Sequence, residues 1–230
     1  ITNCGLPEEY EMAAGILRQL DFPTFIIPGN HDNNRNMIRG LAHVFPLLGD
    51  DPEKICYVVD DYELRMVFVD SSIDGLVSGE IGSSRLEWLA DMLNLEKEKQ
   101  TIIFTHHHPV PSGCAHMDTL CCADGHSLLE LLKDNPQVTR LFCGHTHRTI
   151  VQSHGNLVIC TAPGAAHQVP YDRVDREGFY SLEPPAMLMH NYSVDIGMVS
   201  WVCSLAVFDG PFRFETTCGC PEYSSPGSEV

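Results

Sequence analysis

The chain of 230 residues has no long hydrophobic run, because none of its apolar stretches approaches the roughly 20 residues that a membrane-spanning helix needs. It is also poor in positive charge, with 14 lysines and arginines against 31 aspartates and glutamates and a formal net charge of -17. A protein that neutralises a nucleic-acid backbone has the opposite balance. We therefore expect neither membrane insertion nor a nucleic-acid partner. The acidity does not exclude a phosphate substrate, since bound divalent ions would supply positive charge locally.

Paired C-x-x-C motifs are missing although the chain has ten cysteines, and no cysteine stands near a histidine at zinc-finger spacing. Cys143 and Cys160 lie in apolar runs and are expected to be buried thiols. The adjacent Cys121 and Cys122, or Cys218 and Cys220, could form disulfides, and the spacing leaves their connectivity open. The first residues show no secretory signal peptide, so we expect a cytoplasmic protein.

Helix-like and strand-like segments alternate along the chain, which predicts a layered α/β sandwich. Helices are expected at residues 7–20, 36–44, 84–95 and 126–132, the third behind a capping-box pattern at Ser84 and Glu87. Strands are expected at residues 24–27, 55–59, 64–69, 101–104, 138–143, 149–152, 157–161, 186–189 and 198–207. The loop-like residues 164–185 are interpreted as a lid or interface segment, with an ordinary surface excursion as the alternative, and residues 223–230 as a frayed tail.

Three loops rich in histidine each follow a β-prone run. They are Gly29-Asn30-His31-Asp32 after residues 23–28, His106-His107-His108 after residues 101–104, and Gly144-His145-Thr146-His147 after residues 138–143. Loops that leave the ends of neighbouring strands converge on one crevice in a layered α/β fold. The three loops together therefore predict a metal centre, whereas ordinary structural histidines are the alternative. Two divalent ions about 3.5 to 4 Å apart would clamp a phosphodiester and activate a water, which indicates a metal-dependent phosphoesterase.

Within the histidine run, His106 occupies the position where a strand side chain turns into the crevice, so it is the favoured metal ligand. His107 is expected to shape the site as a neighbour, and His108 to be an exposed loop histidine before Pro109. His145 and His147 flank a single residue, so their imidazoles can bind the same or adjacent ions.

The Asn30 amide oxygen suits a hard or borderline ion that imidazoles already bind. His31 beside it could face the substrate, where it would stabilise the phosphoryl oxygens or protonate a leaving alkoxide. Asp32 could cap its own loop or orient an imidazole.

These motifs resemble those of the calcineurin-like metallophosphoesterases, and most closely the bacterial glycerophosphodiesterases, which are akin to class III cyclic-nucleotide phosphodiesterases. The resemblance covers nearly the whole chain. Besides the three histidine loops it includes Asn3-Cys4-Gly5 with Pro7-Glu8-Glu9-Tyr10, Asp70-Ser71-Ser72, and His167-Gln168-Val169-Pro170-Tyr171.

The resemblance implies a four-layer α/β/β/α sandwich over residues 1–222 and a site with two divalent ions, of Fe, Mn, Co or Zn. It implies that Asn30, His106 and His145 bind one ion, that His147 binds the other, and that His31 and His167 face the substrate phosphate. It also implies a small phosphodiester as substrate and a homo-oligomer.

The chain departs from the family at its start, where an Asp-x-His pair and a Gly-Asp pair with the metal-bridging carboxylate are missing, and Ile1 corresponds to the residue after that aspartate. We therefore expect an N-terminally truncated domain that is largely inactive by itself. The favoured activity is hydrolysis of glycerophosphodiesters to glycerol 3-phosphate and an alcohol. The alternatives are hydrolysis of 3',5'-cyclic nucleotides and a degenerate metal-binding scaffold without catalysis.

Overall fold

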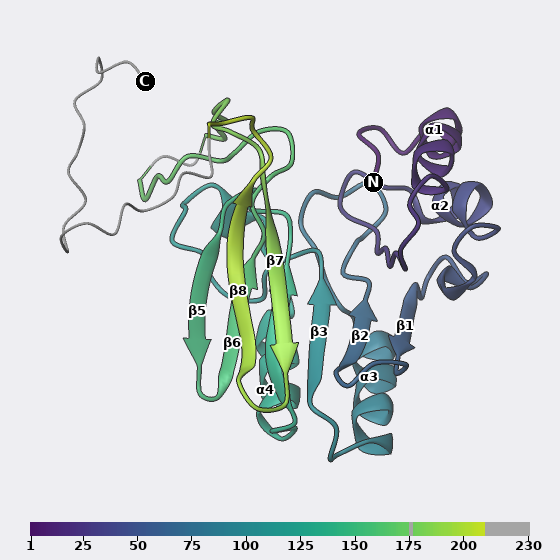
Figure 1. The fold of residues 1–230 in the computed structure, drawn as a ribbon, viewed down its shortest axis with the longest axis vertical. Coiled ribbons are helices and arrows are strands. Elements are labelled where there is room, and N and C mark those ends of the chain that lie inside the picture. Colours follow the sequence, from purple (N-terminus) through teal and green to yellow (C-terminus); the bar gives the residue numbers. More distant parts are fainter. Residues whose placement is uncertain (175–176, 210–230) are drawn as a thin grey trace, which may run out of the picture.

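A mixed sheet of six strands forms the centre of the fold, in the order β1-β2-β3-β4-β6-β5 (Figure 1). The computed structural model describes residues 1–174 and 177–209. The inner strands run parallel, and the two edge strands are antiparallel to their neighbours. The strands are β1 (Cys56–Val59), β2 (Arg65–Val69), β3 (Thr101–Thr105), β4 (Val138–Cys143), β5 (Ile150–His154) and β6 (Leu157–Thr161). The predicted α/β class and the predicted hairpin of β1 and β2 are confirmed.

One face of this sheet is covered by two helices, α3 (Ser83–Leu95) and α4 (Gly125–Lys133). Leu89, Leu93 and Leu128 from these helices join the same buried cluster as Ile103 of β3 and Leu141 of β4. Since side chains alternate along a strand, the neighbouring residues of β3 and β4 point to the opposite face.

The opposite face carries a separate hairpin of β7 (Ala186–Ser193) and β8 (Gly197–Ser204), which overlies the sheet in Figure 1. Leu188 and Met198 of the hairpin pack against Ile102, Phe142 and Cys160 of the sheet. The sheet is therefore covered on both faces, which agrees with the burial of almost every residue of the central strand β3.

Four aromatic rings line up across the strands on this hairpin-facing side. Tyr57, Phe68, Phe104 and Phe142 are direct register partners on β1, β2, β3 and β4. Successive ring centroids lie 4.6, 4.7 and 5.5 Å apart in stacked orientations. Cross-strand aromatic pairs stabilise a sheet and fix its register, so this row helps to align the strand ends that carry the site.

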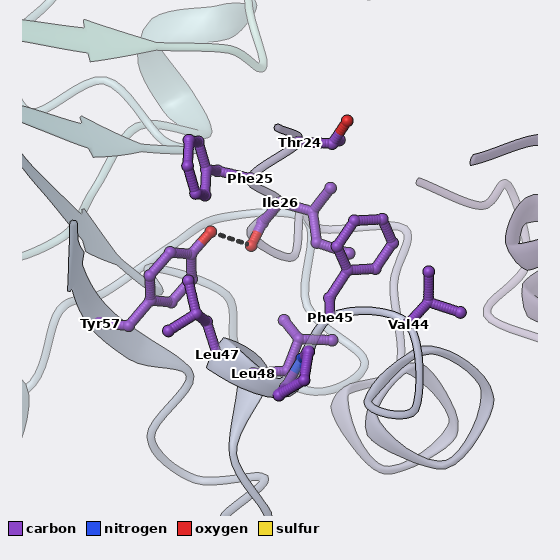
Figure 2. A pocket seen from close by; sticks show the side chains of 9 residues that line it. Thr24, Phe25, Ile26, Val44, Phe45, Leu47, Leu48 and Tyr57 are labelled. Carbon is purple, nitrogen blue, oxygen red and sulfur yellow. Dashed lines mark hydrogen bonds between the residues drawn. The ribbon is translucent and has the colours of Figure 1, made fainter. Parts of the chain in front are cut away.

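The predicted strand at residues 24–27 is wrong. The segment is extended, but it lies against the aromatic row through Phe25, whose ring centroid is 5.7 Å from that of Phe68. The Tyr57 hydroxyl donates a 2.8 Å hydrogen bond to the Ile26 carbonyl, and both residues line an apolar pocket of about 120 Å³ (Figure 2). A segment that contacts the sheet through side chains does not join its hydrogen-bond ladder, and flanking Pro23 and Pro28 lack the N–H that pairing needs.

The helices agree with the predicted segments, with shifted ends. The first is α1 (Pro7–Leu17), which ends three residues early, and the second is α2 (Asn34–Leu41), whose first turn is capped by the Asn33 side chain. The capping box at Ser84 is wrong, because α3 begins at Ser83. Asp124 instead accepts the Ile81 and Gly82 amides at 2.8 Å each, just before that helix. Two short 3-10 helices are η1 (Pro46–Leu48) and η2 (Met117–Thr119).

The cysteines that the structure describes are free thiols, so Cys121 and Cys122 do not form a disulfide. Cys143 and Cys160 are buried, as predicted. The predicted tail at residues 223–230 and the pair Cys218 and Cys220 lie outside the described residues. None of the described helices is both long and apolar enough to cross a membrane.

Removing one ring of the aromatic row should destabilise the fold. We expect Phe68→Ala to lower the free energy of unfolding by roughly 3–5 kcal/mol, because it leaves a cavity between Tyr57 and Phe104. Phe22→Ala, at a ring that is 59% exposed, should change it by less than about 0.5 kcal/mol. Urea denaturation of both variants measures the difference, and equal effects would contradict a structural role for the row.

Candidate metal centre

The parallel pairing of β3 and β4 places two histidine loops side by side. Thr105 and Cys143 are register partners at the ends of these strands. One residue further on, the Gly144 amide donates a 3.0 Å hydrogen bond to the His106 carbonyl. His106 and His145 therefore leave adjacent strand ends together, and their ring centroids lie 5.1 Å apart.

The third loop reaches the same point through Asn30. Its side-chain oxygen lies 2.8 Å from His106 Nε2 and 3.2 Å from His145 Nδ1. Asp32 fixes the loop, since its buried carboxylate accepts the Gly29 amide at 3.0 Å and the Tyr10 hydroxyl at 2.9 Å. Of the two roles predicted for Asp32, these bonds correspond to capping its own loop.

Glycine at position 29 has a steric reason. A Cβ atom there would lie 2.8 Å from His106 Cε1, closer than real side-chain contacts allow. The backbone of the Asn30 loop can approach the imidazole only because this residue has no side chain.

The turn after β4 is strained. His145 and His147 have positive φ values of 63° and 45°, and they are the non-glycine residues with that conformation in the described chain. Such backbone costs on the order of 1–3 kcal/mol per residue and persists where the surrounding structure imposes it, often at functional sites. Here it turns both imidazoles away from the continuing strand direction.

His107 is fully bonded to protein groups. Its Nδ1 lies 2.9 Å from the Ser71 hydroxyl, its Nε2 lies 3.1 Å from the Val77 carbonyl, and its backbone amide donates to Ser71 Oγ. Burial lowers the pKa of His107 to about 4. The carbonyl can only accept, so Nε2 carries the proton and Nδ1 accepts from Ser71.

The prediction that His108 is an exposed loop histidine is wrong. The residue is 1% exposed, and its ring stacks at 6.0 Å from that of His145. Neither ring nitrogen has a hydrogen-bond partner among the described residues, and Asp118 lies 3.9 Å from Nε2. Burial lowers the pKa of His108 to about 4, so the ring is neutral. The Cys122 amide donates a 3.0 Å hydrogen bond to the His108 carbonyl, and this contact with the segment before α4 holds the residue inside the fold.

His147 and His167 form a second pair of rings, with centroids 4.4 Å apart. Burial and the neighbouring His167 lower the pKa of His147. His31 is exposed, and its Nδ1 lies 2.9 Å from the Asn3 carbonyl. The structure thus brings Asn30, His106 and His145 together at one point. Of the other predicted site residues, His147 and His167 form the ring pair and His31 is exposed.

The donor set suits a divalent metal ion. Burial, and then the neighbouring imidazoles, lower the pKa of both His106 and His145, which keeps them in the neutral form that binds metals. Ring nitrogens of His106, His107 and His145 lie within 4.8 Å of one another. His145 Nε2 and His147 Nδ1 are buried without a hydrogen-bond partner in the described structure, and buried polar atoms of this kind call for one.

Sequence reasoning did not assign a role to Ser71, which holds His107 in place. The available signal was the polar run Asp70-Ser71-Ser72 directly after β2, at the same sheet edge as the histidine loops. Asp70 is fully buried and pairs with Arg85 at 3.0 Å, which fixes the start of this loop.

Comparisons with known proteins agree on one family. Residues 1–149 match the profile of the calcineurin-like phosphoesterases. The chain is 39% identical to the glycerophosphodiester phosphodiesterase GpdQ of Enterobacter lignolyticus over 221 residues, which covers 96% of this chain and 79% of that protein. It is 33% identical to a probable GpdQ of Arcobacter nitrofigilis over 93% of this chain and 78% of that protein.

More distant matches point the same way. A 3',5'-cyclic AMP phosphodiesterase, CpdA of Escherichia coli K12, is 31% identical over 56% of this chain and 44% of that protein. A dimetal phosphatase from Danio rerio superposes with a TM-score of 0.50 at 15% identity, over 77% of this chain and 71% of that one, which shows a shared fold.

The bond between Ser71 and His107 gives a test of the scaffold around the centre. Ser71→Ala removes the hydroxyl that serves both the ring and the amide of His107, and we expect a loss of roughly 1–3 kcal/mol in the free energy of unfolding. Ser153→Ala, at an exposed position on β5, is the matched control. Chemical denaturation compares the two, and equal stability of both variants would show that His107 does not depend on Ser71.

Proposed function

Because this chain belongs to the calcineurin-like phosphoesterase family, we propose that it hydrolyses small phosphodiesters, with glycerophosphodiesters as the preferred substrates. The products would be glycerol 3-phosphate and an alcohol. The relatives named GpdQ, which match over more than nine-tenths of this chain, support that choice, whereas the cyclic AMP phosphodiesterase CpdA matches over 56% of it.

The observation that carries the proposal is the shared position of the Asn30 side-chain oxygen, 2.8 Å from His106 Nε2 and 3.2 Å from His145 Nδ1. Three donors from three loops then meet where one divalent ion would bind. When bound, divalent ions supply a Lewis acid that offsets phosphate charge and lowers the pKa of water. A phosphodiester anion would otherwise meet a chain with a net charge of -17.

A second ion of the same class, of Fe, Mn, Co or Zn, belongs to the proposal, with His147 as a ligand. The unpartnered Nδ1 of His147 supports this assignment. His107 is left out, because Ser71 and Val77 already occupy both of its ring nitrogens. It would instead hold the neighbouring His106 in orientation.

His31 and His167 are proposed to contact the substrate phosphate. The His31 Nδ1–H donates a hydrogen bond to the Asn3 carbonyl. This leaves Nε2 of the exposed ring, when protonated, available to donate to a phosphoryl oxygen or a leaving alkoxide. His167 lies against His147, so it would meet the same phosphate from the other side.

The proposal extends to the architecture. Residues 1–222 would form one metallophosphoesterase domain of the four-layer α/β/β/α type, with residues 164–185 as a lid or interface segment and the functional unit a homo-oligomer. The helices on one face of the sheet and the hairpin on the other support the layered part of this assignment.

Low activity is the expectation for the 230-residue chain itself. Within the described residues, the side chains that meet at Asn30 are neutral, and manganese prefers carboxylate oxygens, so this donor set should hold it weakly. We therefore expect about one manganese ion per chain and slow turnover.

The substrate class is tested by turnover of glycerophosphoethanolamine against cyclic AMP on the manganese-loaded chain, with glycerol 3-phosphate and AMP as the products detected. We expect the glycerol diester to be cleaved faster, and His145→Ala to abolish cleavage. His154→Ala, at an exposed histidine on β5, is the control. Faster cleavage of cyclic AMP would favour the cyclic-nucleotide activity, and manganese binding without turnover of either substrate would favour a non-catalytic scaffold.

The ligand assignment has its own test. Asn30→Ala should weaken manganese binding by at least about tenfold, because it removes the oxygen that faces His106 and His145. Asn30→Asp keeps an oxygen there and adds charge, so its affinity should equal or exceed that of the wild type. Titration calorimetry measures both, and unchanged affinity in Asn30→Ala would exclude Asn30 as a ligand.

A further inference from the structure

The segment that connects β6 to β7, described at residues 164–174 and 177–185, has its two ends side by side. The Ala186 amide donates a 3.1 Å hydrogen bond to the Gly164 carbonyl, where the segment begins and ends. Gln168 is 4% exposed, and its side-chain amide bonds the Gly164 backbone at both ends, at 2.7 and 3.2 Å. Gln168 and Ser181 exchange backbone hydrogen bonds of 3.0 and 2.8 Å, which closes the segment further.

Arg148 fastens this segment to the metal-centre turn. It directly follows His147, and its Nε donates to the Val169 carbonyl at 2.8 Å. The two terminal nitrogens of its guanidinium donate to the two carboxylate oxygens of Glu183 at 2.8 and 2.7 Å. Ser181 Oγ donates to the same carboxylate at 2.7 Å. The Arg148 side chain therefore binds both the start of the segment, at Val169, and its end, at Glu183. Arg148 itself directly follows the proposed ligand His147.

The fastened segment carries two rings toward the site. The His167 ring lies 4.4 Å from that of His147, and the Tyr180 ring lies 5.5 Å from that of His167. Tyr180 is 70% exposed. Their positions relative to His147 depend on how firmly the segment is held, since neither ring is enclosed by the core.

We propose that Arg148 and Glu183 are a positioning pair, whose two-pronged ion pair holds the His167 and Tyr180 segment against the metal-centre turn so that a phosphate anion can bind there. This inference rests on the proposed function, because it assumes that the substrate phosphate binds beside His147 and His167. Neither residue of the pair needs to touch the substrate.

The chemistry of the pair suits a fixed tether. Arginine matches a carboxylate with two parallel hydrogen bonds in one geometry, which lysine cannot reproduce. The Arg148 and Ser181 hydrogen bonds lower the pKa of Glu183 to about 2, so its carboxylate stays charged at neutral pH. A partly exposed pair adds little to global stability, so its effect should appear in the order of this segment rather than in the unfolding of the protein.

The test compares Glu183→Gln, Arg148→Lys and the double variant with the wild-type chain. The matched control is Glu130→Gln, which removes the same charge from an exposed pair with Lys133 on α4. Three quantities are measured: hydrogen exchange of the Gln168 and Ser181 amides, the affinity of the manganese-loaded chain for inorganic phosphate, and the affinity for manganese.

We expect either single variant to accelerate exchange of these amides by at least about tenfold and to weaken phosphate binding by at least about fivefold. Manganese affinity should stay within about twofold of the wild-type value. The double variant should lose no more phosphate affinity than either single variant, because each single substitution already removes the same interaction. Glu130→Gln should change none of the three.

Three results would overturn the proposal. If Glu183→Gln and Arg148→Lys leave phosphate affinity unchanged, the positioning role alone is excluded. It is also excluded if these variants lose manganese affinity to the same extent as phosphate affinity. A wild-type chain that binds manganese without binding phosphate overturns the proposed function, and the positioning role falls with it.

Discussion

The parallel pairing of β3 with β4 is the constraint on which the site depends. Its register sets Thr105 opposite Cys143, so the chain leaves both strands at one level and His106 and His145 meet with almost no loop between strand and ligand. The aromatic row from Tyr57 to Phe142 fixes that register on one face, and the leucines of α3 and α4 fix it on the other. Ligand geometry is thus inherited from core packing, and a slip of one residue would reverse every side chain.

Much of the fold could be predicted from the sequence because its signals are local. Apolar β-prone runs gave β3, β4 and β6, and helical periodicity gave α3. The error at residues 24–27 has a different origin, since strand propensity describes a residue's own preference and cannot say whether a pairing edge is available. That segment has the composition of a strand, but it contacts the sheet through the aromatic side chains of Phe68 and Tyr57.

The sequence could predict only part of the geometry around the candidate metal centre. The meeting of His106 and His145 follows from the parallel pairing of β3 and β4, whereas Asn30 reaches them on an extended segment that does not join the sheet. The bonds of His107 to Ser71 and Val77 depend on a loop after β2, and the burial of His108 involves the Cys122 amide before α4. No spacing in the sequence relates either segment to the histidine run. Such tertiary contacts decide which of three adjacent imidazoles is free to act.

The hydrogen bond between the Ala186 amide and the Gly164 carbonyl brings the two ends of the β6–β7 connection together, and further bonds from Ala115 and Arg148 fasten the connection to neighbouring loops. A closed excursion can lengthen or shorten without moving β6 or β7, and doubling the length of a flexible loop costs only about 0.6 kcal/mol in closure entropy. Related chains can therefore differ in the length of this connection while the strand ends that carry His106 and His145 stay in register.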